Sequence, residues 1–205
     1  MKEYSSSNPL MAVGFEDGYF PPKLKEMKGY RTVLAAVLME NVKPKSVVLN
    51  LIEIDGLDGT EKAIQALLKL QGKSQVDVVL LGGITFAGFN IIDPVEIYEA
   101  FDRSVIVVTE DKPSDEEVEK ALRKHFLDWK DRLKILRRFR EKAKIHRVRK
   151  VKGKLFIQPL GLNVEEAENI VLKLILKGKY PEPLRLAKTI ASSLAKLIFH
   201  EERYL

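Results

Sequence analysis

RTVLAAVLMENVKPKSVVLNLIEI, residues 31–54, contains two apolar segments separated by a short polar one. Residues 31–40 form an apolar run of strand length, and residues 46–54 alternate between branched apolar side chains and others. The link between them, Asn41–Pro44, is short and turns the chain. Two adjacent apolar strands with so short a link predict an antiparallel hairpin.

The segments around this hairpin predict a mixed α/β fold. Upstream, residues 11–16 read MAVGFE and predict a strand that ends at Asp17-Gly18. Downstream, the predicted strands are 76–81, 104–109 and 154–158, and they alternate with helices that begin near Asp58 or Thr60, near Pro94, at Ser114, at Val164 and at Pro183. Three antiparallel strands followed by parallel strands, with helices on both faces of the sheet, are the order of a ribonuclease H-like fold.

Composition narrows the classes of function. The chain has 205 residues with no linker or internal repeat, so we expect a single domain over residues 1–205. The absence of cysteine excludes disulfides, thiol catalysis and Cys-ligated zinc or iron–sulfur sites, and three His leave little room for a histidine-rich metal centre. No apolar stretch approaches 18 residues, and the first ten residues lack the apolar core of a signal peptide. We therefore expect a cytoplasmic protein without a membrane segment.

The formal net charge of +6 hides an uneven distribution. Residues 120–154, predicted to continue as a long basic helix, contain 16 Lys and Arg and only 3 Asp and Glu, a net of +13, while the rest of the chain is acidic, at −7. A local basic patch can bind the phosphates of DNA or RNA even when the net charge is modest. A solvated helix face is the alternative interpretation. The candidate phosphate-binding residues are Arg137, Arg138, Arg140, Lys144, Arg147 and Arg149.

Acidic residues follow two of the predicted strands. Glu16 and Asp17 close the first strand, and Asp55 and Asp58 follow the third. Ligands of open α/β sheets bind beyond strand ends, and converging carboxylates require a cation. Oxygen ligands suit Mg²⁺ or Mn²⁺, and hydrolysis of phosphodiesters by two metal ions needs carboxylates held in this way. The alternative is that these residues form ordinary turns and helix caps.

Four motifs carry a family resemblance. They are Gly14–Phe20 (GFEDGYF), Asp55–Thr60 (DGLDGT), Gly83–Asn90 (GITFAGFN) and Tyr180–Ala187 (YPEPLRLA). Together they resemble the uncharacterised archaeal family related to endonuclease V, known as domain of unknown function 99. Endonuclease V is a ribonuclease H-like, magnesium-dependent nuclease that cleaves nucleic acid near deaminated purines, chiefly inosine.

This resemblance implies roles for the acids. Glu16 and Asp17 take the position of the acid that ends the first strand, and Asp55 or Asp58 takes that of the second acid. The pattern expects a third acid, an Asp, where this chain has Gly82, which cannot ligate a metal through a side chain. The resemblance also favours a pocket wall made of Thr85, Phe86, Phe89 and Asn90, and the alternative is that this loop packs against the core.

Three hypotheses remain open from the sequence. The first is an endonuclease V-like, Mg²⁺- or Mn²⁺-dependent nuclease, divergent or catalytically impaired. The second is a non-catalytic module that binds nucleic acid on a degenerate nuclease fold. The third is a protein whose basic helix docks on the acidic surface of a partner. The sequence does not choose between DNA and RNA, and it leaves the oligomeric state open.

Overall fold

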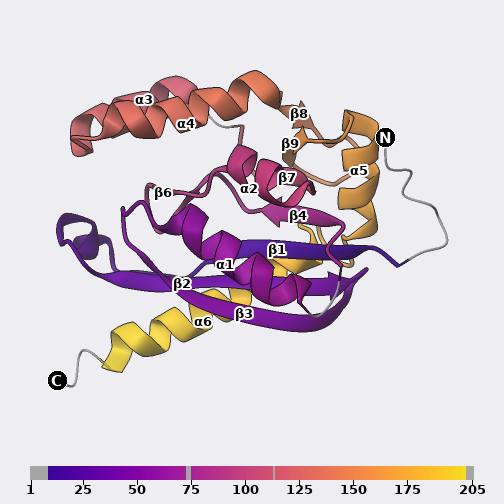
Figure 1. Cartoon of the computed structure of the whole chain (residues 1–205), viewed down its shortest axis with the longest axis horizontal. Helices are drawn as coiled ribbons and strands as arrows, with labels where there is room; N and C mark the ends of the chain where they lie inside the picture. The colour runs from indigo at the N-terminus through magenta and orange to yellow at the C-terminus, as the bar shows by residue number, and fades with distance from the viewer. Residues whose placement is uncertain (1–8, 73–74, 113, 202–205) are drawn as a thin grey trace.

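A seven-stranded sheet organises the computed structural model, which describes residues 9–72, 75–112 and 114–201 (Figure 1). In the order β3-β2-β1-β4-β7-β9-β8, neighbouring strands are hydrogen-bonded. The bounds are β1 (Met11–Asp17), β2 (Arg31–Glu40), β3 (Lys43–Glu53), β4 (Val78–Leu81), β7 (Ser104–Thr109), β8 (His146–Arg147) and β9 (Phe156–Leu160). A small second sheet pairs β5 (Thr85–Phe86) with β6 (Asn90–Ile91).

The predicted hairpin of residues 31–54 is confirmed as β2 and β3, and β1 pairs with β2 antiparallel on its other side. Strands β4 and β7 then continue the sheet in parallel, as expected. Strand β9 differs, because it runs antiparallel to β7 and passes through Pro159, which we expected to end it. Strand β8 pairs only with residues 156 and 157 of β9. At Pro159, β9 therefore has no neighbour on that side, and the backbone N–H that proline lacks is not needed there.

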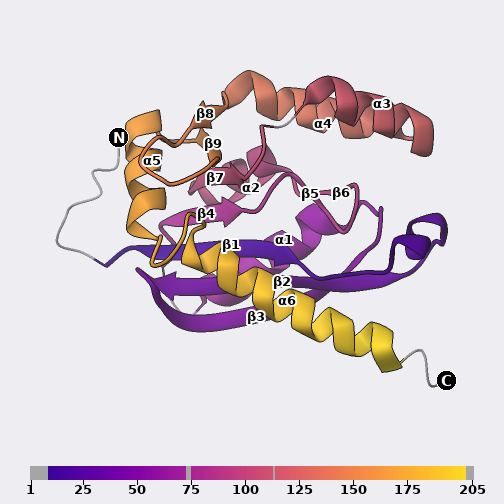
Figure 2. The ribbon, with the colours of Figure 1, turned by 180° about the vertical axis from the view of Figure 1, so that it is seen from behind.

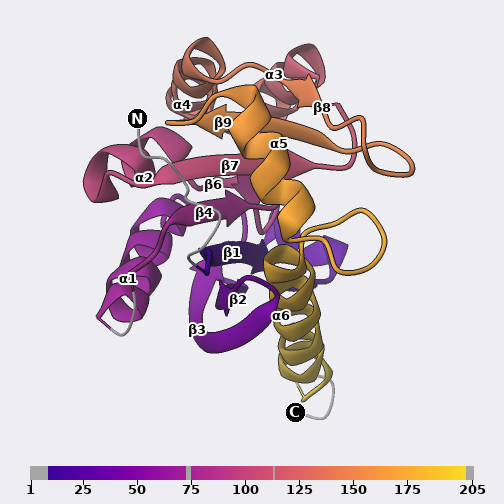
Figure 3. The same cartoon turned by 90° about the vertical axis from the view of Figure 1, so that its right-hand side faces the viewer.

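Helices cover both faces of the sheet (Figures 1 and 2). Helices α1 (Gly59–Gln71) and α2 (Pro94–Phe101) lie on one face, and α5 (Val164–Lys173) and α6 (Glu182–Glu201) lie on the other. Helices α3 (Asp115–His125) and α4 (Trp129–Lys142) pack together at the β9 end (Figure 3), and a short 3₁₀ helix, η1, spans Pro22–Glu26. No helix in the described ranges is long and apolar enough to span a membrane.

Side chains along β1 point alternately to the two faces of the sheet, and this alternation sets the direction of those at its C-terminal end. Val13 and Phe15 belong to the large core cluster that includes α1 and α2, whereas Ala12 packs with residues of α5 and the start of α6. Since neighbouring side chains on a strand point to opposite faces, Glu16 follows Ala12 and Gly14 toward α6.

The basic segment is not one long helix. It is divided between α3 and α4, and α4 ends at Lys142, so Lys144, Arg147 and Arg149 lie beyond it. Gln158 of β9 contacts the C-terminal end of α4. Its side-chain Nε2 donates to the carbonyl of Ala143, and its Oε1 accepts from Arg140. The helix carbonyl is thereby satisfied by a strand side chain.

Candidate functional site

The candidate site lies where the carboxyl ends of β1 and β4 face α6. Two glycines, Gly14 in β1 and Gly18 just after it, let α6 approach the sheet closely. A Cβ at Gly14 would lie 2.7 Å from the backbone nitrogen of Leu184, and one at Gly18 would lie 2.6 Å from the carbonyl oxygen of Ala191. Any side chain at these two positions would push the helix away. Lys188, one turn from each of these contacts, is thereby held at the end of β1.

Glu16 is a buried carboxylate with two partners from the C-terminal part of the chain. The residue is only 5% exposed. The hydroxyl of Tyr180 donates to its Oε1 at 2.7 Å, and the Nζ of Lys188 lies 3.6 Å from its Oε2. Lys188 also donates to Oδ1 of Asp17 at 2.8 Å. One ammonium group therefore serves both carboxylates at the end of β1.

Burial controls the ionisation of this group. It raises the pKa of Glu16 from 4.5 to about 7, although Lys188 and Tyr180 act in the opposite direction. The pKa of Tyr180 is raised by burial and by the neighbouring Glu16 carboxylate. Burial opposes the charge on Lys188, but Asp17 and Glu16 together raise its pKa. Tyr180 and Lys188 therefore stay protonated, while Glu16 exchanges its proton near neutral pH.

Gly82 is matched to Glu16. A Cβ added to Gly82 would collide with Oε1 and with Cδ of Glu16. The longer side chain of Glu16 thus lies over the end of β4, in the place where a residue at position 82 would carry its own side chain.

The other predicted acids hold the loop of residues 83–90. Asp17 accepts through Oδ2 from the backbone N–H of Ala87 at 2.6 Å, and Asp55 accepts through Oδ1 from that of Phe89 at 2.8 Å. Asp58 accepts from the side chain of Asn90 at 2.7 Å and from the backbone of Glu53 at 3.1 Å. These carboxylates therefore position the backbone of a distant loop, and Asp58 makes no side-chain cap on α1.

The arrangement does not fit a divalent cation. Throughout the described ranges, no three His, Cys, Asp or Glu side chains gather so that they could hold a metal ion. Glu16 and Asp17 share an ammonium group, Asp55 and Asp58 bind backbone and amide donors, and position 82 has no side chain. A Mg²⁺ or Mn²⁺ site needs several free carboxylate oxygens around one point.

The expected pocket residues lie in the small β5–β6 hairpin. Phe86 is 2% exposed and Asn90 is fully buried, with its Oδ1 accepting from the backbone of Gly59 at 2.8 Å. Phe89 packs edge-to-face against Phe126, with ring centroids 5.4 Å apart, and Thr85 is partly exposed. Phe86 and Asn90 pack inside the protein, so they do not line an open surface.

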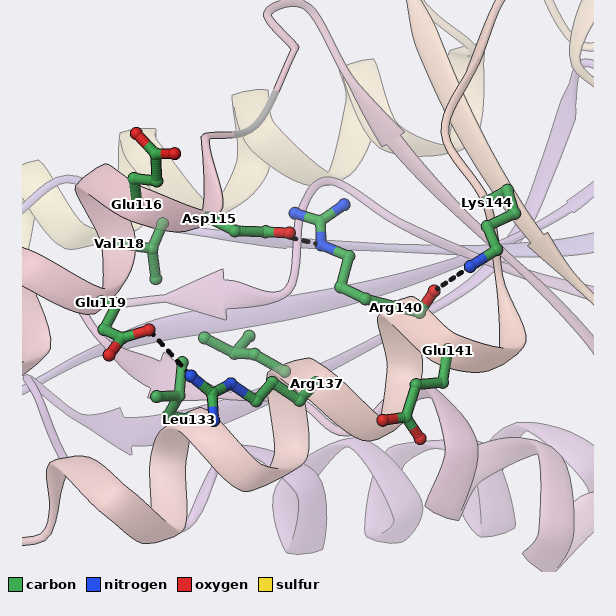
Figure 4. A pocket seen from close by; sticks show the side chains of 10 residues that line it. Asp115, Glu116, Val118, Glu119, Leu133, Arg137, Arg140, Glu141 and Lys144 are labelled. Carbon is green, nitrogen blue, oxygen red and sulfur yellow. Dashed lines mark hydrogen bonds and ion pairs between the residues drawn. The ribbon is translucent and has the colours of Figure 1, made fainter.

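The predicted phosphate-binding arginines of α4 have acidic partners within the chain. A hollow of about 360 Å³ lies between α3 and α4, with an apolar floor that includes Leu133. Figure 4 shows the side chains that line it. Across it, Arg137 pairs with Glu119 at 3.0 Å and Arg140 with Asp115 at 3.0 Å. Arg138 pairs with Asp93, the residue that caps α2. These ion pairs tie α4 to α3 and α2.

The remaining predicted cations lie beyond the end of α4. Lys144 bonds only to the carbonyl of Arg140, at 3.4 Å. Arg147 and Arg149 are exposed, and their side chains make no ion pair with any residue that the structure describes. The same holds for the three lysines that follow them, Lys150, Lys152 and Lys154.

Sequence reasoning missed Tyr180, Lys188 and Arg132. Tyr180 opens the last motif and Lys188 directly follows it, but no local pattern pairs them with Glu16. Arg132 lies within the basic segment yet is 4% exposed. It donates to the carbonyl oxygens of Asp55, Gly56 and Phe89 at 2.9, 3.0 and 2.6 Å and pairs with Asp128. This arginine therefore joins α4 to the two loops beside the site.

Known structures share this fold. A protein of unknown function from Archaeoglobus fulgidus superposes with a TM-score of 0.78 at 29% identity, covering 90% of this chain and 98% of that one. Endonuclease V of Ciona intestinalis, in complex with a 23mer DNA containing an inosine, superposes with a TM-score of 0.63 at 16% identity, covering 96% and 89%. The ribonuclease H-like fold of endonuclease V is thus the fold of this chain.

Sequence comparisons define the family. A UPF0215 protein of Thermococcus gammatolerans is 40% identical over 185 residues, which cover 90% of this chain and 91% of that protein. A UPF0215 protein of Methanothermobacter thermautotrophicus is 33% identical over 183 residues, covering 89% and 86%. The sequence model of the family described as endonuclease dU matches residues 9–195. The chain belongs to this archaeal family, related in fold to endonuclease V, as its four motifs predicted.

Proposed function

We propose that this chain binds DNA containing a deaminated base, with deoxyuridine as the first candidate, and that binding needs no divalent cation. Two comparisons support the class of ligand. The family is described as endonuclease dU, and a protein of the same fold has been crystallised with inosine-containing DNA. The independence from metal rests on the carboxylates of the site, which are occupied by protein donors.

The observation that carries the proposal is a group of exposed cations in a loop that approaches Lys179. The loop after β8 contains Arg149, Lys150 and Lys152, which are exposed and make no ion pair in the described part of the chain. A Cβ at Gly153 of this loop would lie 3.6 Å from Cδ of Lys179. Lys179 immediately precedes Tyr180, which hydrogen-bonds Glu16. Figure 3 shows this loop and the segment that joins α5 to α6 on the same side of the molecule.

This loop is a better phosphate-binding surface than α4. Cations that already pair with carboxylates must lose those partners before they bind phosphate, as Arg137, Arg138 and Arg140 would. Reversing their charges would also break contacts between helices, so weaker binding by such variants would have two causes. Arg149, Lys150 and Lys152 make no ion pair with a described residue, so they have no carboxylate partner to lose and their replacement breaks no ion pair between helices.

Binding is tested with short labelled duplexes that contain one deoxyuridine, one inosine or neither, with and without EDTA. We expect salt-sensitive binding that persists in EDTA, tighter to the deoxyuridine duplex. A variant combining Arg149→Gln, Lys150→Gln and Lys152→Gln should bind more weakly. Its plot of log affinity against log salt should be less steep by about 2 to 3, near 1 for each phosphate that the variant no longer neutralises.

A matched control removes the same charge elsewhere. Lys43→Gln, Lys69→Gln and Lys134→Gln together neutralise three exposed lysines on β3, α1 and α4. This control should keep the salt dependence of the wild-type protein. Equal affinities of the loop variant and the control, or undetectable binding of the wild type at low salt, would reject the proposal.

Metal-dependent cleavage is the second candidate, and family membership favours it. The assay incubates the protein with Mg²⁺ or Mn²⁺ and the same DNA and RNA substrates, alongside the Thermococcus gammatolerans relative. We expect this chain to leave these substrates intact in the presence of either metal ion. Cleavage by the wild-type chain that EDTA abolishes would establish the second candidate instead.

A further inference from the structure

The side chain of Lys188 is held between two carboxylates. Its Nζ lies 2.8 Å from Oδ1 of Asp17 and 3.6 Å from Oε2 of Glu16. The helix that carries it cannot easily shift, because α6 touches the backbone of β1 where Gly14 and Gly18 lack side chains. The ammonium group is therefore placed by the packing of α6 on the sheet as well as by its own ion pairs.

Glu16 and Gly82 are the second part of this arrangement. The Glu16 carboxylate covers the end of β4, where it collides with any Cβ at position 82. Its Oε1 is fixed there by the Tyr180 hydroxyl. The side chain that reaches over β4 thus comes from β1, and β4 itself contributes no carboxylate.

The protein itself supplies the groups that offset the charge of these carboxylates. Two carboxylates meet one ammonium group and one hydroxyl donor, and the second oxygen of Asp17 is satisfied by the backbone of Ala87. Two carboxylates that share one partner are costly to keep ionised unless a cation compensates them. Here the cation belongs to the protein.

We propose that Lys188 is the resident cation of this site, and that Glu16, Gly82 and Lys188 form a matched set that replaces a bound divalent ion. This inference deepens the metal-independent part of the proposed function and rests on it, but its test measures metal affinity and is separate from the DNA-binding test. It predicts that removing Lys188 alone opens the ion site in part, and that changing all three residues opens it fully.

The test measures Mn²⁺ binding by electron paramagnetic resonance and calorimetry on the full chain. The triple variant Glu16→Asp, Gly82→Asp and Lys188→Ala should bind Mn²⁺ at least about tenfold more tightly than the wild type, since affinity follows the number of charged ligands. The double variant Glu16→Asp and Gly82→Asp, which retains Lys188, is the matched control and should stay close to the wild type.

A single variant keeps the proposal testable if the triple variant does not fold. Lys188→Met leaves the carboxylates of Glu16 and Asp17 without the cation that they share, so added Mn²⁺ should raise its thermal unfolding midpoint more than that of the wild type. A wild-type protein that binds Mn²⁺ as tightly as the triple variant, or that is stabilised by Mn²⁺ as much as Lys188→Met, would overturn the proposal. So would a double variant that equals the triple variant.

Discussion

The carboxylate of Glu16 lies in the space that a side chain at position 82 would need, and Gly82 leaves that space open. Gly82→Asp alone should therefore destabilise the fold, by about 2 to 4 kcal/mol, because it overfills the site and adds a buried like charge. Combined with Glu16→Asp, which withdraws the first carboxylate by one methylene, it should cost less than the sum of the two changes.

Denaturant unfolding of the wild type, both single variants and the double variant measures this coupling. Gly72→Asp is the control, since a Cβ there meets no atom closer than 3.7 Å. Additive effects at positions 16 and 82 would contradict the geometry. The same collision means that Gly82→Asp by itself should not restore a metal site.

The pKa of Glu16 makes stability depend on pH. This pKa is 4.5 in the unfolded chain and about 7 in the fold, so between these values the folded state holds a proton that the unfolded state has lost. Stability contributed by this group should fall as the pH rises from about 4.5 to about 7, by up to about 3 kcal/mol, and then stay level. Glu16→Gln should remove this decline, whereas Glu141→Gln, at an exposed position, should not. Parallel pH profiles of unfolding free energy for the three proteins would expose an error in the assignment.

The Tyr180 hydroxyl favours the ionised form of Glu16 through its hydrogen bond. Tyr180→Phe should therefore raise the pKa of Glu16 above about 7 and extend the decline in stability to higher pH. The measurement compares Tyr180→Phe with the variant that also carries Glu16→Gln, so that other titrating groups cancel. An unchanged upper limit would show that the bond does not influence Glu16.

The sheet could be predicted from sequence because its signals are local. Residues 31–54 contain two apolar runs and a turn in one short stretch, and they fold as β2 and β3. The course of β9 through Pro159 depended instead on where β8 stops, which is a property of the assembled sheet. Local patterns therefore identified the elements better than their pairing.

The candidate site was predicted only in part, for a related reason. Glu16 and Asp17 were found because they end a strand within a motif, but Tyr180 lies 164 residues from Glu16 and Lys188 lies 171 residues from Asp17. Likewise, the arginines of α4 form a basic pattern in the sequence, while the acid that pairs with Arg138 lies 45 residues away. A charge count cannot separate paired cations from unpaired ones.

Arg132 gives the clearest contrast between two arginines of α4. Arg132→Met would leave the carbonyl oxygens of Asp55, Gly56 and Phe89 without their buried donor, and we expect it to destabilise the fold by about 3 kcal/mol. Arg137→Met removes a largely exposed ion pair with Glu119 and should cost less than about 1 kcal/mol. Denaturant unfolding compares the two, and hydrogen exchange at the amide of Phe89, which donates to Asp55, reports on the loop directly. Faster exchange of this amide in Arg132→Met, but not in Arg137→Met, is the expected result. Equal effects of the two substitutions would mean that the buried guanidinium does not hold the loops beside Glu16 in place.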